Sequence, residues 1–172
     1  MGVTRLACTV AVASITLAGS ALSLAQDGFC LPTGVACTGF PLQIDVFAPD
    51  HGQTVVRQFK DKAGNVVRLL TVAGQGNTLV FTRAVTEDCS VTSQKQLSIK
   101  TNGSVVNTRY NADGTQTVTN TGQNVVIFFP TDHPGPSSNL YVGRLVYTID
   151  ILGAFTFKSF NGAATDICAA LQ

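Results

Sequence analysis

Short β-type runs separated by turn signals restrict the fold of this chain more than any other feature. Val, Thr, Phe and Ile dominate the runs, and Gly or Asn-Gly interrupts them about every eight to twelve residues. No segment has the periodicity of an amphipathic helix. The chain is therefore predicted to be an all-β protein with about 8–10 antiparallel strands.

Four segments predict tight hairpins. Residues 61–65, 111–115 and 150–154 each place a glycine where a three-residue loop needs the left-handed conformation. Residues 101–104 contain Asn-Gly, the signal of a two-residue turn. Connections this short imply that strands adjacent in sequence pair with one another.

The turn at 150–154 sets a register that the flanking side chains can test. It places Ile149 opposite Phe155, Tyr147 opposite Phe157 and Val146 opposite Lys158. One face of the hairpin is then apolar and the other mostly polar, as in a sheet with one side in the core. The predicted core residues are Leu145, Tyr147, Ile149, Phe155 and Phe157.

Residues 125–129 are apolar on both faces. This pattern predicts a central strand that is covered on both sides. The preceding Thr121-Gly122-Gln123 is either a turn or a glycine bulge within one long strand, and the strand count depends on which.

The first 25 residues have the features of a secretory signal. Arg5 precedes an apolar run that Thr, Ser and Gly interrupt, and small residues lead up to Ala25. Cleavage after Ala25 would leave residues 26–172 as a single domain without a membrane anchor. That domain has as many basic as acidic side chains and no basic run, which argues against nucleic acid and anionic membranes as partners.

Four cysteines remain after cleavage, namely Cys30, Cys37, Cys89 and Cys168. An even number in an exported chain predicts two disulfides, and the lack of a C-x-x-C pair argues against zinc. Loop entropy alone favours the local pair Cys30–Cys37, because the loop between them is short.

Strand order favours a different pairing. Up-and-down strands with short connections favour a closed β-barrel over the alternative, a β-sandwich, because closure removes exposed edges. With an even strand number, the first strand (residues 41–48) and the last (155–161) would be antiparallel neighbours. Cys37 would then bridge Cys168, and Cys30 would pair with Cys89.

Three segments are similar to segments that recur in an uncharacterised family of small secreted bacterial β-proteins. They are CTGFP at 37–41, FFPTD with PGP at 128–136, and TDICAAL at 165–171. The resemblance spans most of the chain after the signal and implies a Cys37–Cys168 pair. It carries no assigned activity and therefore implies no catalytic residue.

Asp132-His133, in the loop after the central strand, is a candidate for chemistry. A histidine side chain can serve as an acid or a base in catalysis, and Asp132 could orient that of His133. The same loop also fits an ordered turn, in which Thr131 or Asp132 caps the backbone between prolines. Asp50-His51-Gly52 is most simply a hairpin turn, and Glu87-Asp88 a solvated turn.

Arg109 and Tyr110 lie on a polar hairpin, residues 107–121, that could hydrogen-bond a carbohydrate or peptide; a solvated sheet face explains the same composition. The weak ligand-binding candidates are Asp132, His133, Arg109 and Tyr110. No motif of a serine hydrolase, metalloenzyme or cofactor site occurs, and no pair of carboxylates predicts a glycosidase.

Two hypotheses follow for function. The first is a secreted, non-catalytic protein that binds a small ligand or an extracellular or surface partner. The alternative is a small exported enzyme that uses His133 and Asp132 in a barrel mouth.

Overall fold

The structure is a computed structural model that describes residues 27–49 and 54–172. The described residues form ten strands and one short helix, which confirms the all-β prediction. The elements are β1 (Asp27–Leu31), β2 (Leu42–Phe47), β3 (Thr54–Lys60), β4 (Val66–Ala73), β5 (Thr78–Ala84), β6 (Thr92–Lys100), β7 (Val105–Tyr110), β8 (Gln116–Phe128), β9 (Ser137–Ile149), β10 (Phe155–Asp166) and α1 (Ile167–Ala170).

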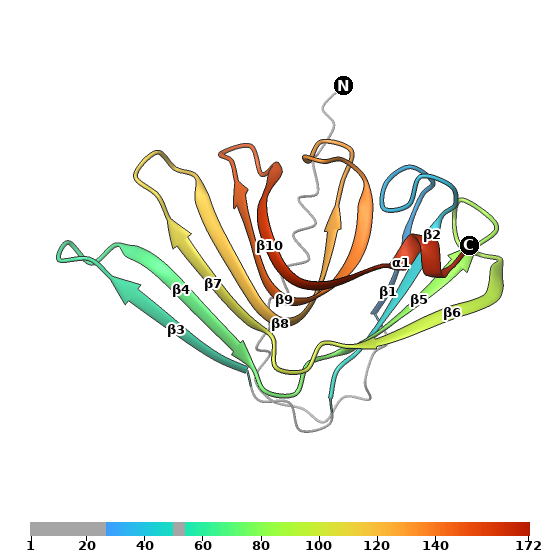
Figure 1. The fold of residues 1–172 in the computed structure, drawn as a ribbon, viewed down its shortest axis with the longest axis horizontal. Helices are drawn as coiled ribbons and strands as arrows, with labels where there is room; N and C mark the ends of the chain where they lie inside the picture. Colours follow the sequence, from blue (N-terminus) through green and yellow to red (C-terminus); the bar gives the residue numbers. More distant parts are fainter. Residues whose placement is uncertain (1–26, 50–53) are drawn as a thin grey trace.

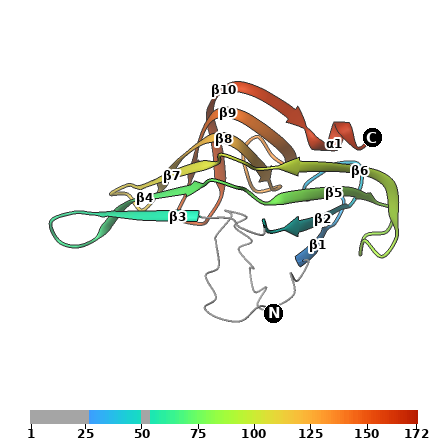
Figure 2. The same ribbon diagram turned by 90° about the horizontal axis from the view of Figure 1, so that it is seen from below.

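The strands form two antiparallel sheets (Figures 1 and 2). The four-stranded sheet has the order β1-β2-β5-β6, and the six-stranded sheet has the order β10-β9-β8-β7-β4-β3. Neither sheet closes on itself, so the predicted closed barrel is not found among the described residues. A sandwich-like arrangement of two sheets fits the strand order as well.

Among the described residues the strands do not close into one barrel, because the chain changes sheets where a hairpin is predicted. Residues 101–104 join β6 to β7, which lie in different sheets and do not pair. This connection runs beside the one that joins β4 to β5, since Ala73 N donates to Ser104 O at 2.9 Å and Thr101 N donates to Asn77 O at 3.0 Å. The Asn-Gly step thus lies in a connection that passes from one sheet to the other and not in a hairpin.

The connection from β2 to β3 also crosses between the sheets. A hairpin around Asp50-His51-Gly52 was predicted to pair the strands on either side, and this pairing is wrong because β2 and β3 lie in different sheets. Residues 50–53 themselves lie outside the described part of the chain. Residues 61–65, 111–115 and 150–154 do connect paired strands, as predicted.

A row of three glycines bends strands β8, β9 and β10 of the six-stranded sheet. Gly143 on β9 is the register partner of Gly122 on β8 and of Gly162 on β10, and all three have positive φ. A Cβ at Gly143 would overlap the carbonyl oxygen of Asn161. Figure 1 shows β8, β9 and β10 each turning at the bottom of the view and rising on the other side. Gly122 is thus a bend within one long strand.

The bend produces two apolar clusters on opposite faces of the same strands. Val126 and Phe128 of β8 face the inside of the bend, whereas Val125 and Ile127 face the four-stranded sheet. Residues 125–128 are therefore covered on both faces, as predicted. They are not between two paired strands, however, because among the described residues β7 pairs with residues 116–121 of β8 and only β9 pairs with residues 122–128. The inner cluster comprises Val118, Val126, Phe128, Tyr141, Leu145 and Tyr147. The outer cluster comprises Ala36, Cys37, Phe40, Leu42, Ile44, Leu79, Phe81, Ile99, Ile167 and Leu171.

The register of the last hairpin agrees with the prediction near the turn and departs from it further on. Ile149 pairs with Phe155 and Tyr147 with Phe157, but a bulge then places Val146 opposite Ser159. Of the predicted core residues, Leu145 and Tyr147 are buried, and Ile149 and Phe155 pack against the inner cluster. Phe157 is exposed, so its core assignment is wrong.

Two disulfides confirm the predicted pairing, Cys30 with Cys89 and Cys37 with Cys168. The route to the second one differs from the prediction. Cys168 lies in α1, which follows β10 and reaches across to the four-stranded sheet (Figure 1). The bridge therefore ties a helix to a loop between β1 and β2 and does not join neighbouring strands. Within residues 27–49 and 54–172, no helix has the length and apolar character to cross a membrane.

Candidate functional site

The loop between β8 and β9 is held in place by Asp132. This side chain is buried, and its two carboxylate oxygens accept backbone N–H groups from Phe129 at 2.6 Å and from Phe155 at 2.8 Å. The first bond caps the turn, and the second ties the loop to the start of β10. The capping role that the sequence suggested for Asp132 is present.

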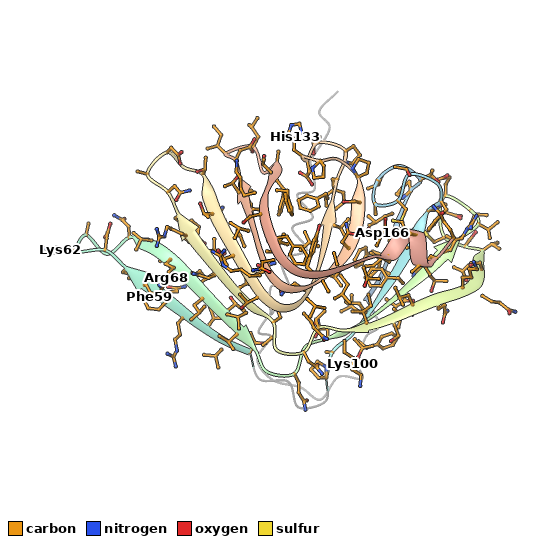
Figure 3. All side chains as sticks on the ribbon, viewed as in Figure 1. Phe59, Lys62, Arg68, Lys100, His133 and Asp166 are labelled. Carbon is orange, nitrogen blue, oxygen red and sulfur yellow. A yellow bond between two sulfur atoms is a disulfide. The ribbon has the colours of Figure 1, made fainter. Side chains whose placement is uncertain are left out.

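His133 contributes to the same link through its backbone. Its N–H donates to Phe155 O at 2.9 Å and its carbonyl accepts from Phe157 N at 2.9 Å, so that it bridges to Thr156 in the parallel direction. The His133 side chain is exposed (Figure 3). Both oxygens of Asp132 bond to backbone groups of other residues, so the arrangement does not present an oriented Asp-His pair.

Arg109 and Tyr110 lie at the end of β7, far from that loop. A single register row runs from Arg109 through Thr117, Thr148 and Thr156 to the bridge at His133. At a strand spacing of about 4.8 Å, four steps separate Arg109 from His133 by roughly 19 Å along the sheet. The four predicted ligand-binding residues therefore do not form one site.

Arg109 instead lies beside residues of β3 and β4. Arg68 on β4 is its register partner, and the Arg68 guanidinium lies 3.7 Å from the centroid of the Phe59 ring on β3 (Figure 3). The Arg68 Nε atom is buried and has no hydrogen-bond partner in the part of the chain that the structure describes. Arg68 and Arg109 thus occupy paired positions on neighbouring strands, and the Phe59 ring lies against the Arg68 guanidinium.

A shallow hollow of about 400 Å³ lies over these residues. Its lining, which we name the basic edge, consists of Phe59, Val67, Arg68, Arg109 and Tyr110. Sequence reasoning found Arg109 and Tyr110 but missed the other three residues. The turn at 61–65 predicts that β3 pairs with β4, but its register alone would place Phe59 opposite Val67. A bulge between Phe59 and Lys60 places Arg68 opposite Phe59, and this shift has no signal in the local sequence.

The electrostatics around the basic edge are unbalanced. Five cations and only two acids lie on β3, β4, β7 and the turns that follow β3 and β7. Both acids are held in those turns. Asp61 accepts from Asn65 N at 2.9 Å and Asp113 from Thr115 N at 3.0 Å.

Hydrogen bonds favour the ionised form of both of these carboxylates. Bonds from the Asn65 backbone and side chain lower the pKa of Asp61, and bonds from the Thr115 side chain and backbone lower the pKa of Asp113. The hydrogen bonds given for Asp61 and Asp113 are thus made within their own turns and not to Arg68 or Arg109.

The remaining described features offer less chemistry. The inside of the bend is filled by side chains, of which Phe128 and Leu145 have no exposed surface. A second hollow, of about 380 Å³, lies between β6 and the far halves of β8, β9 and β10, and most of its lining is uncharged. In the described part of the chain, no three His, Cys, Asp or Glu residues are grouped as metal ligands.

Comparisons with protein-family models, with curated proteins and with solved structures found no match for this chain. The proposal for its function therefore rests on the geometry of its own residues.

Proposed function

We propose that this chain is an exported, non-catalytic binding protein whose basic edge takes an anionic partner outside the cell. The observation that carries the proposal is the pair of guanidinium groups of Arg68 and Arg109 on adjacent strands, with Arg68 stacked on Phe59.

The chemistry of this pair suits carboxylates. A guanidinium presents a planar fork of N–H donors that a carboxylate accepts in bidentate fashion. Stacking on Phe59 restricts the Arg68 side chain before any partner arrives, which lowers the entropy lost on binding.

Export is supported by two independent features. The first 25 residues have the pattern of a secretory signal, and the described residues contain two disulfides, which persist in oxidising compartments. No observation favours the alternative of an exported enzyme, because the carboxylate of Asp132 is engaged by backbone groups.

Binding to poly-glutamate tests the proposal. The mature protein is expected to bind poly-glutamate and not poly-lysine, with an affinity that falls as salt is added. Replacing both arginines (Arg68→Ala with Arg109→Ala) should weaken binding by at least about tenfold, since each charge-assisted hydrogen bond contributes on the order of 1.5–3 kcal/mol.

Arg144→Ala is the matched control, because Arg144 is an exposed arginine on β9 away from the basic edge. It should change the affinity by less than about twofold. Equal binding by the double variant and the unaltered protein would show that the basic edge is not the site.

A further inference from the structure

Strand β3 is an open edge beside the basic edge. It is the last strand of the six-stranded sheet, and among residues 27–49 and 54–172 its only pairing partner is β4. All of its residues are exposed, and TVVRQFK contains no proline. The backbone groups on its outer side are therefore available to pair with another extended chain.

The side chains of β3 are apolar as well as basic. Val55, Val56 and Phe59 are 46%, 51% and 37% exposed, respectively. Because side chains alternate along a strand, Val55, Arg57 and Phe59 share one face and Val56 lies on the other. Arg68 lies on the first face, since it pairs with Phe59 and stacks on its ring.

A second copy of this chain is a poor occupant of the edge. Antiparallel pairing of β3 with itself about its central residue would place Arg57 of one copy opposite Arg57 of the other. Like charges placed opposite one another destabilise a strand pair. Charges on an edge strand are a recognised device against such self-pairing.

The same charges favour an acidic strand. An acidic residue on the added strand would face Arg57 on the side of the sheet that carries Arg68, and apolar residues would cover Val56 on the other side. Main-chain hydrogen bonds would supply affinity and the alternating side chains specificity. An acidic polysaccharide would supply negative charge, but it has no backbone amide groups that could pair with β3.

We infer that the partner of the basic edge is an extended polypeptide with alternating acidic and apolar residues, which adds to β3 as a further strand of the six-stranded sheet. This inference rests on the proposed function, because it names the class of anion that the basic edge takes.

Short synthetic peptides test strand addition with the mature protein. The probe is an eight-residue peptide of alternating Glu and Val with blocked ends. Two companions carry N-methyl groups on its odd or its even backbone nitrogens, which removes the N–H donors of one edge and leaves the charge unchanged. Lys-Val peptide and polygalacturonate complete the set.

The Glu-Val peptide is expected to bind and to slow hydrogen exchange at backbone amides of β3. At least one N-methylated companion should bind at least about tenfold more weakly, because a strand pairs through only one of its edges. Arg57→Ala should weaken Glu-Val binding, whereas Arg144→Ala should not. Lys-Val peptide should not bind.

The failures of the two proposals differ. Undiminished binding by both N-methylated peptides, or equal binding by polygalacturonate without protection of β3, would overturn strand addition and leave the anion site standing. Absence of binding by every anion would overturn both. A dimer whose formation protects β3 would overturn the choice of an acidic partner.

Discussion

The carboxylate of Asp132 joins two segments that are distant in sequence. It accepts one N–H within its own turn and one from Phe155, at the start of β10. Asp132→Ala would leave two part-buried N–H donors without their carboxylate partner and should lower the free energy of unfolding by about 2–3 kcal/mol. Urea titration measures this change.

His133→Ala provides the comparison for Asp132→Ala. The His133 side chain is exposed and its contribution to the loop is through the backbone, so the variant should stay within about 0.5 kcal/mol of the unaltered protein. A loss for His133→Ala that equals that of Asp132→Ala would contradict the assignment of the link to the carboxylate.

The candidate site shows where residue-scale prediction stops. The turn-capping role of Asp132 follows from the prolines and the polar residues beside it. The bond to Phe155 does not, because it crosses 23 positions of sequence and depends on how β10 is placed. Arg109 was found in its polar hairpin, but its neighbour Arg68 becomes visible only through the pairing of β4 with β7.

At the scale of elements, the pairing of β9 with β10 beyond the turn depends on one bulge in β10. With the register predicted from the turn at 150–154, Gly143 would face Asn161. The bulge between Phe157 and Ser159 shifts the pairing by one residue and brings Gly143 opposite Gly162. The chain can bend sharply there only because these aligned residues lack a Cβ. A shift of this kind has no signal in the local sequence.

Gly143→Ala tests the role of the glycine row. At φ +139°, residue 143 lies where side chains are strained, and its new Cβ would overlap the carbonyl oxygen of Asn161. The variant should lose at least about 2 kcal/mol of unfolding free energy in urea titration. Gly135→Ala is the control, since Gly135 has φ +105° and open space around it. An equal loss in both variants would show that backbone conformation alone sets the cost.

At the scale of the whole molecule, local signals predicted the strands well and their assembly poorly. Turn residues and alternation identify hairpins, because both depend on neighbours in sequence. The departure of β6 and β7 into different sheets depends on hydrogen bonds between residues 73–77 and 101–104, which only the assembled sheets reveal. The charge imbalance between the basic edge and the rest of the chain is likewise invisible in a net charge near zero.

The two disulfides should differ in how much they stabilise the molecule. Cys37–Cys168 spans 131 residues and Cys30–Cys89 spans 59, so loop entropy alone gives about 5 and about 4 kcal/mol, respectively. Cys37 is also buried in the outer cluster, where the bridge holds Ile167 and Leu171 of the C-terminal segment against the four-stranded sheet.

Removing the long bridge (Cys37→Ala with Cys168→Ala) should therefore cost more unfolding free energy in urea than removing the short one (Cys30→Ala with Cys89→Ala). It should also speed hydrogen exchange in α1, which the short-bridge variant should leave unchanged. If the short-bridge variant were the less stable of the two, α1 would be held by its packing and not by the disulfide.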